Sequence, residues 1–205
     1  MGLLLGFAPW IVYWVLVANA PFLVAVLIPL ALAVASMAIG RTKKMPGFTF
    51  ELGSVGTFLL LTVLTLTVNQ SFLERWLAPL SYVGIFSVVL IGVLIGKPFI
   101  REFAELTQPA EVINTPVYLR ITAVVTWIWV AAYGAMTLSA AVPPIMRSTA
   151  TFLDTSGPPS FIFYWVIPFS LMGITAIATR VLPDRMMRSQ VPEPAPESDS
   201  RQQLK

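Results

Sequence analysis

The side chains that most often carry out chemistry in proteins are scarce in this chain. Cysteine and histidine are both absent from its 205 residues, which removes thiolate nucleophiles, imidazole bases and the common ligands of zinc, copper and haem. The carboxylates of Glu51, Glu102 and Glu105 could act on lipid headgroups, but no catalytic spacing links them. We therefore predict a non-enzymatic protein without a cofactor or metal, and a membrane enzyme stays an open alternative.

Hydroxyl groups gather in one apolar stretch, where Thr57, Thr62 and Thr65 lie between residues 52 and 68. Hydroxyls inside a transmembrane helix can line a polar path, although threonine more often bonds to its own helix or packs against a neighbour. The three threonines are candidate residues of a polar path. They are the main support for a small-molecule or lipid transporter.

Glycines mark the next apolar stretch. Gly92 and Gly96 form a G-x-x-x-G pair, and Gly84 lies two helical turns earlier. Small residues at this spacing let two helix backbones approach closely. We predict that the three glycines are helix-packing positions, and packing within the chain is favoured over a dimer contact.

The segment 97–106 is the most informative polar connection. Phe99, Phe103 and Leu106 fall at positions i, i+4 and i+7, which predicts a short amphipathic helix in the plane of the lipid headgroups. Its apolar face could stay in lipid or dock a partner protein. The candidate contact surface consists of Lys97, Pro98, Phe99, Arg101 and Phe103.

The composition is that of a membrane protein. Hydrophobic residues make up 57% of the chain and charged residues only 11%, against about 25% charged in ordinary soluble domains. The net charge of +3 reflects where Lys and Arg lie along the chain, and no binding of nucleic acid is expected. The predicted fold class is all-α, a polytopic transmembrane helical bundle.

Six apolar stretches are long enough to predict transmembrane spans. The first lacks the basic start of a cleaved signal peptide, so we count it as a span. Residues 1–183 form the predicted transmembrane domain, and residues 184–205 are predicted to be a disordered cytoplasmic tail because they are polar and rich in proline. The spans are residues 3–18, 22–39, 52–68, 77–95, 121–142 and 161–181.

Basic residues predict the orientation. With six spans, most of them fall on the side that holds both termini, whereas Arg75 and Arg147 fall on the other side. The positive-inside rule then places both termini in the cytoplasm. Four tryptophans lie towards span ends, where we expect them at the membrane interface: Trp10, Trp14, Trp76 and Trp165. The basic residues on the terminal side are Arg41, Lys43, Lys44, Lys97, Arg101, Arg120, Arg180, Arg185 and Arg188.

Several features follow one another in a familiar order. They are Phe7-Ala8-Pro9, the basic stretch 41–45, the connection 69–76, the sequence Lys97-Pro98-Phe99-Ile100, and Gln108-Pro109 followed by Val117. Over residues 7–142 this order resembles the intracellular septation protein A family, small bacterial inner-membrane proteins associated with cell-envelope integrity and septum formation. The resemblance implies no catalytic residues. The sixth span and the tail depart from the family pattern.

The leading hypothesis is a non-enzymatic protein of the bacterial cytoplasmic membrane that supports envelope maintenance or septation through protein and lipid contacts. The resemblance implies that its partners are membrane lipids and envelope-synthesis or division proteins. A transporter and an accessory subunit of a larger membrane complex remain alternatives.

Overall fold

The computed structural model describes residues 2–42, 48–104, 109–147, 149–153 and 158–188. These residues are almost entirely helical and contain no strand, so the all-α prediction is confirmed. The helices are α1 (Gly2–Leu16), α2 (Phe22–Thr42), α3 (Phe48–Thr67), α4 (Gln70–Leu94), α5 (Phe99–Ala104), α6 (Ala110–Ile113), α7 (Pro116–Met146), α8 (Pro158–Phe161), the π-helical turn η1 (Ile162–Val166) and α9 (Ile167–Arg188).

Within the described part of the chain, five helical segments are long and apolar enough to cross a membrane. Helix α1 is also apolar but has 15 residues, which corresponds to about 22 Å and falls short of the roughly 30 Å hydrocarbon core. The first predicted span is therefore a helix of less than full spanning length. The five longer segments are Phe22–Thr42, Thr49–Thr67, Gln70–Leu94, Pro116–Met146 and Pro159–Pro183.

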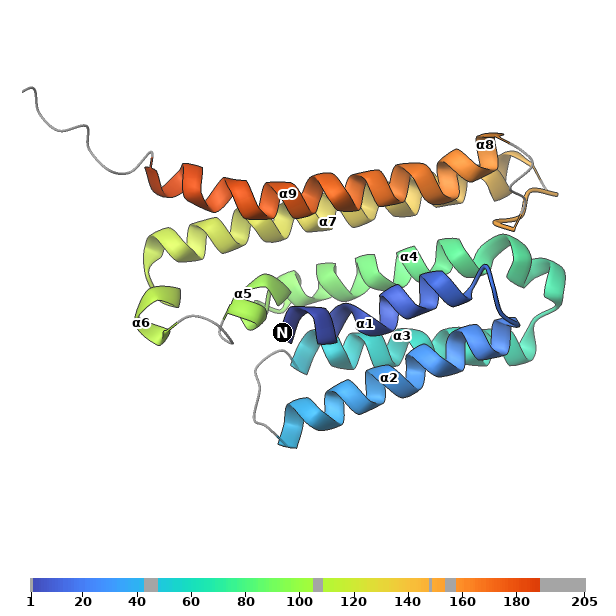
Figure 1. Cartoon of the computed structure of the whole chain (residues 1–205), viewed down its shortest axis with the longest axis horizontal. Helices are drawn as coiled ribbons and strands as arrows, with labels where there is room; N and C mark the ends of the chain where they lie inside the picture. Colours follow the sequence, from blue (N-terminus) through green and yellow to red (C-terminus); the bar gives the residue numbers. More distant parts are fainter. Residues whose placement is uncertain (1, 43–47, 105–108, 148, 154–157, 189–205) are drawn as a thin grey trace, which may run out of the picture.

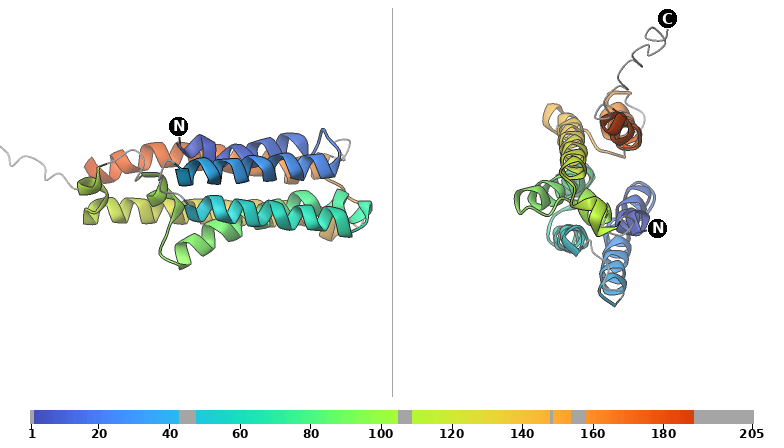
Figure 2. Two further views of the ribbon diagram at one scale, coloured as in Figure 1. Left: turned by 90° about the horizontal axis from the view of Figure 1, so that it is seen from below. Right: turned by 90° about the vertical axis from the view of Figure 1, so that its left-hand side faces the viewer.

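The long helices lie side by side along one axis, as Figures 1 and 2 show. Each packs mainly on its neighbours in the sequence, α1 on α2, α2 on α3, α3 on α4, α4 on α7 and α7 on α9. Helices α5 and α6 lie at the end that also holds the N-terminus (Figure 1). We call this the Lys97 end and the opposite end of the bundle, where α4 begins, the Arg75 end.

Helix α1 packs one face into the interior of the bundle, while Ile11 and Val15 on its other face are exposed. Its side chains Trp10 and Tyr13 are completely buried and Trp14 is nearly so. Trp10 packs on Phe58 of α3 at a ring-centroid distance of 4.8 Å, and Trp14 stacks on Tyr82 of α4 at 5.7 Å. The prediction that Trp10 and Trp14 sit at the membrane interface is therefore wrong. Their spacing of three to four residues instead aligns the rings along one face of α1, which packs against α3, α4 and α9.

A proline in the last long segment frees backbone carbonyls that other helices satisfy. Pro168 has no N–H, so it cannot bond to the carbonyl of Tyr164 in an α-helical register or of Phe163 in the π register of η1. Ser139 of α7 donates to the Phe163 carbonyl at 2.8 Å, and the Tyr82 hydroxyl donates to the Tyr164 carbonyl at 3.4 Å. These bonds join α4, α7 and the α9 segment inside the membrane region.

Two predicted boundaries need correction. Residues 70–76, predicted as a connection, form the start of α4, because Asn69 accepts a 2.9 Å hydrogen bond from the Phe72 N–H and caps the helix. The predicted tail also begins too early, since α9 continues from Asp184 to Arg188. Polarity ends a transmembrane stretch but does not end a helix. Residues 189–205 lie outside the described part of the chain.

Candidate functional site

Helix α4 ends in a glycine cap that turns the chain back towards the bundle. Gly96 adopts a φ of 75°, a left-handed conformation that favours glycine. The Lys97 N–H donates to the Gly92 carbonyl at 2.8 Å and the Gly96 N–H to the Val93 carbonyl at 3.0 Å, the bond pattern of a Schellman motif. Gly96 thus closes α4, and no atom lies within 4 Å of the place a Cβ would take, so the helix-packing prediction does not fit it.

Helix α5 inserts its aromatic face into the bundle. Phe99 is 3% exposed and Phe103 8%, and their rings lie 5.7 Å and 5.9 Å from that of Phe50 on α3. A Cβ on Gly6 of α1 would lie 2.7 Å from Phe103 Cζ, so α1 and α5 meet closely. The prediction of a lipid or partner surface therefore does not hold for Phe99 and Phe103. Their rings find aromatic partners inside the bundle.

The polar members of the predicted contact surface stay outside. Lys97 is exposed and Pro98 half-buried. Arg101 is half-buried and donates a 3.3 Å hydrogen bond to Asn114 Oδ1, in the turn between α6 and α7. Glu105 lies outside the described residues. Only the edge of the predicted surface is thus available at the Lys97 end.

Glu102 fixes α5 to the start of α3. Its carboxylate lies beside the Thr49 side chain and the backbone N–H groups of Thr49 and Phe50, which are unsatisfied donors at a helix N-terminus. Among the described residues, its Oε2 atom has no hydrogen-bond partner. Burial raises the pKa of Glu102, while hydrogen bonding from Thr49 and Phe50 and the charge of Lys97 oppose the rise. Glu51 is the second carboxylate close by. Glu102 therefore acts as a structural cap between two helices.

The three candidate threonines do not line one path. Thr57, Thr62 and Thr65 each donate to the carbonyl four residues earlier in α3, at 2.9, 2.7 and 2.8 Å. Thr62 is buried, whereas Thr57 lines a groove beside α4 and Thr65 lines a cleft at the Arg75 end. Their hydroxyls serve their own helix, so the transporter alternative gains no support from them.

The groove that Thr57 lines runs along the flank of the bundle between α3 and α4, and its volume is about 450 Å³. Glycines bring the two helices together here. A Cβ on Gly84 would collide with the Thr57 methyl group, and a Cβ on Gly53 would lie 2.6 Å from Val88 Cγ1. The predicted packing position Gly84 and the candidate Thr57 thus meet at one contact. The groove is lined by Thr49, Leu52, Gly53, Gly56, Thr57, Leu60, Leu61, Leu64, Leu80, Val83, Gly84, Ser87, Val88, Ile91 and Ile95.

Gly56 is an exposed lining residue at the edge of the groove, on the same stripe of α3 as Leu52 and Leu60. No atom lies within 4 Å of the place a Cβ would take at Gly56, and the rims carry exposed side chains such as Leu60 at 60% and Ile91 at 53%. The lining includes hydroxyls but no titratable group. The arrangement suits binding of an apolar partner rather than catalysis. Sequence reasoning missed Gly53 and Gly56, although their spacing with Thr57 at i, i+3 and i+4 could have indicated this surface.

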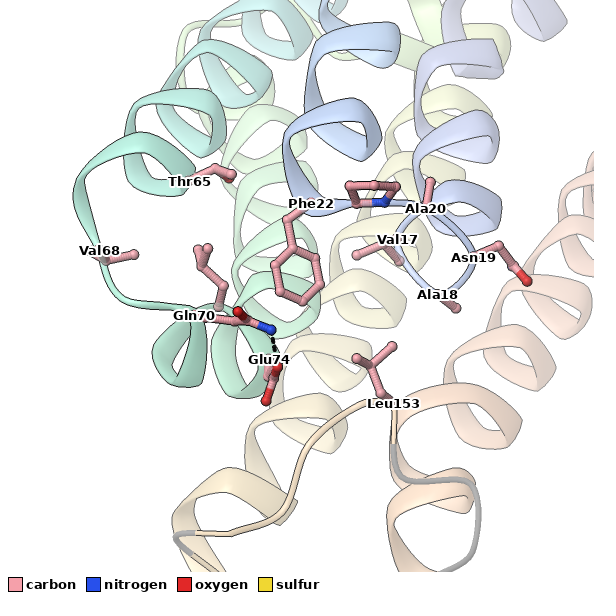
Figure 3. A pocket seen from close by; sticks show the side chains of 12 residues that line it. Val17, Ala18, Asn19, Ala20, Phe22, Thr65, Val68, Gln70, Glu74 and Leu153 are labelled. Carbon is pink, nitrogen blue, oxygen red and sulfur yellow. Dashed lines mark hydrogen bonds between the residues drawn. The ribbon is translucent and has the colours of Figure 1, made fainter.

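A second hollow opens at the Arg75 end, with a volume of about 840 Å³ (Figure 3). It lies between the turn that joins α1 to α2, the ends of α3 and α4 that face each other, and Leu153. Glu74 and Gln70 of α4 contribute its main polar groups. Sequence reasoning missed both residues, because residues 69–76 gave no indication of what they would face.

Comparison with known proteins adds no relative: no family model, no curated protein and no solved structure matches this chain. The candidate sites are therefore interpreted from their own geometry.

Proposed function

We propose that the chain is a non-enzymatic multi-pass protein of the bacterial cytoplasmic membrane that supports envelope maintenance or septation by binding other membrane components. The α3–α4 groove is its binding surface, and the apolar transmembrane helix of a partner protein is the occupant. One observation carries this proposal: the groove is open, lies on the flank of the bundle and is bordered by the exposed glycine Gly56. The septation role itself rests on the family resemblance.

The proposed topology has six crossings with both termini in the cytoplasm. The basic residues at the Lys97 end support this orientation through the positive-inside rule. Helix α1 is short, but its surroundings are protein side chains on several sides. A short helix that is largely enclosed by its neighbours tolerates a mismatch with the bilayer.

The shape of the groove favours a helix over a lipid chain. Its α3 wall extends from Thr49 to Leu64, which is about 22 Å at 1.5 Å per residue. Helix association in lipid depends on close packing rather than on a hydrophobic driving force, and glycine allows that packing. A helix ridge gains backbone contact at Gly56, whereas a flexible acyl chain covers any apolar face of the bundle equally well.

Purification into nanodiscs under mild conditions, followed by mass spectrometry of bound proteins, tests the proposal. The informative variant is Gly56→Leu, which places a bulky side chain at the edge of the groove. Gly173→Leu on α9 is the matched control, because the Cβ position of Gly173 is equally open but lies outside the groove.

We expect an envelope-synthesis or division protein in stoichiometric amount with the wild type and with Gly173→Leu, and its loss with Gly56→Leu. A protein that purifies alone, or a partner retained by Gly56→Leu, contradicts the groove assignment. A bound protein that Gly56→Leu loses, but that has no part in envelope synthesis or division, would support the groove as a binding surface. It would overturn the septation role.

A further inference from the structure

The cleft at the Arg75 end has the size and mixed lining of a ligand site. Its volume of about 840 Å³ falls in the range of roughly 300–1,000 Å³ typical of small-molecule pockets. Val17, Phe22, Leu73 and Leu153 provide apolar walls. Figure 3 shows the Phe22 ring projecting from the start of α2 into the space that Glu74 also borders.

The Glu74 carboxylate is held in place at this cleft. Gln70, one turn earlier on α4, donates a 2.8 Å hydrogen bond to Glu74 Oε1, which Figure 3 marks with a dashed line. The Phe152 N–H donates to the Glu74 carbonyl at 3.2 Å, which fixes the neighbouring Leu153 beside the cleft. Among the described residues, no cation forms an ion pair with Glu74. The carboxylate therefore keeps its second oxygen for a ligand.

The nearest arginine is directed elsewhere. Arg75 Nη2 donates to the Pro144 carbonyl at 3.1 Å, near the C-terminal end of α7, where a cation also favours the helix dipole. Arg75 does not line the cleft, and the described residues that do include one carboxylate and no basic side chain. The described lining of the cleft thus carries net negative charge.

From this geometry we propose that the cleft binds the primary ammonium group of an amphiphile, such as the headgroup of an aminophospholipid. Glu74 is the counter-ion, and Phe22 offers a ring face for a cation–π contact. The cleft lies where the apolar helices end, at the depth of lipid headgroups, and its apolar walls suit the glycerol and acyl portion. This inference does not depend on the partner helix proposed for the α3–α4 groove.

The test uses the full chain in nanodiscs made from equal amounts of phosphatidylethanolamine and phosphatidylglycerol with identical acyl chains. Native mass spectrometry of the released protein measures the ratio of the two lipid adducts. Glu74→Gln removes the charge while keeping the size of the side chain. Glu111→Gln on α6 is the matched control, because Glu111 is exposed at the opposite end of the bundle.

We expect the wild type and Glu111→Gln to retain phosphatidylethanolamine over phosphatidylglycerol by about tenfold, as one charge-assisted hydrogen bond provides. Glu74→Gln is expected to lose this preference with an unchanged Tm. An equal ratio in the wild type, or a preference that survives Glu74→Gln, overturns the proposal.

Added spermidine separates the two possible sources of the ammonium group. Displacement of the phosphatidylethanolamine adduct by spermidine supports the ammonium site and identifies a soluble amine as a ligand. Retention of the adduct, with its dependence on Glu74 intact, identifies the membrane lipid.

Discussion

The interior of the bundle around α1 and the flank between α3 and α4 are built from opposite residue types. Around α1, the large rings of Trp10, Tyr13 and Trp14 are buried and fill the space between helices. Along the flank, Gly53 and Gly84 bring the helices together and Gly56 leaves open space. The bulky residues fill the space between helices, and the small ones leave a hollow on the flank.

This difference follows from the physics of a helix bundle in lipid. Acyl chains are as apolar as leucine, so helices gain little from hydrophobic burial and depend on close van der Waals packing. A ring that contacts several helices contributes many such contacts, and a glycine contributes by bringing two backbones together. Each region can therefore be tested by changing the size of a side chain.

The largest effect is expected from removing a ring at the centre. Trp10→Ala leaves a cavity beside Phe58 and breaks the 2.9 Å hydrogen bond from Trp10 Nε1 to Ser54 Oγ. We expect a loss of about 3–5 kcal/mol in the free energy of unfolding, measured by denaturant titration in mixed micelles. Trp127→Ala is the control, because Trp127 is 53% exposed on α7, and an equal loss in both variants would contradict an interior position for α1.

A smaller effect on the free energy of unfolding is expected to distinguish the closely packed Gly84 from the open position Gly56. Gly84→Ala places a methyl group against Thr57, so we expect a loss of about 1–3 kcal/mol in the free energy of unfolding from overpacking. Gly56→Ala meets open space and is expected to leave the free energy of unfolding unchanged or to raise it by up to about 1 kcal/mol, because alanine favours a helix more than glycine does. The same titration measures both, and a similar loss at Gly56 would show that the groove is closed.

The smallest effect is the pH dependence of stability that Glu102 of α5 contributes at the Lys97 end. Burial raises the pKa of Glu102 above its usual value of 4.5, so the folded chain binds this proton more tightly than the unfolded chain does. This contribution to stability is fully present below pH 4.5 and is lost as the pH rises through the raised pKa. Lys97 and the hydrogen bonds from α3 reduce the effect.

A series of Tm measurements from pH 4.5 upwards tests this prediction. Glu102→Gln should remove part of the fall in Tm with rising pH, because an amide does not titrate, and Glu111→Gln should leave the fall unchanged. An identical pH profile in wild type and Glu102→Gln would show that Glu102 does not carry the effect.

The helical class and the positions of the long helices could be predicted from the sequence because apolar runs of spanning length have few other stable structures. The sequence could not predict which face of each helix contacts lipid and which contacts another helix. A helix that is apolar all round has no hydrophobic pattern that distinguishes the two. The α1 rings are the clearest case. Tryptophan is typical of the membrane interface, but the side chains of Trp10 and Trp14 are buried between helices.

Helix α5 shows the same limit on a smaller scale. The spacing of Phe99 and Phe103 predicted an amphipathic helix, and α5 is present. An apolar face at the membrane surface can enter lipid, a partner or its own bundle, and only the position of Phe50 and Gly6 in three dimensions decides among them. The left-handed turn at Gly96 that redirects the chain was likewise interpreted as part of a packing motif.

Site-specific photo-crosslinking in living cells tests the central claim most directly. A photoreactive amino acid replaces Leu60 on the groove rim or, as a control, Leu138 on α7, which is 72% exposed outside the groove. We predict a discrete adduct with one membrane protein at position 60, which Gly56→Leu abolishes, and only lipid adducts at position 138. Lipid adducts alone at both positions, or the same protein adduct at both, would contradict a groove that receives a partner helix.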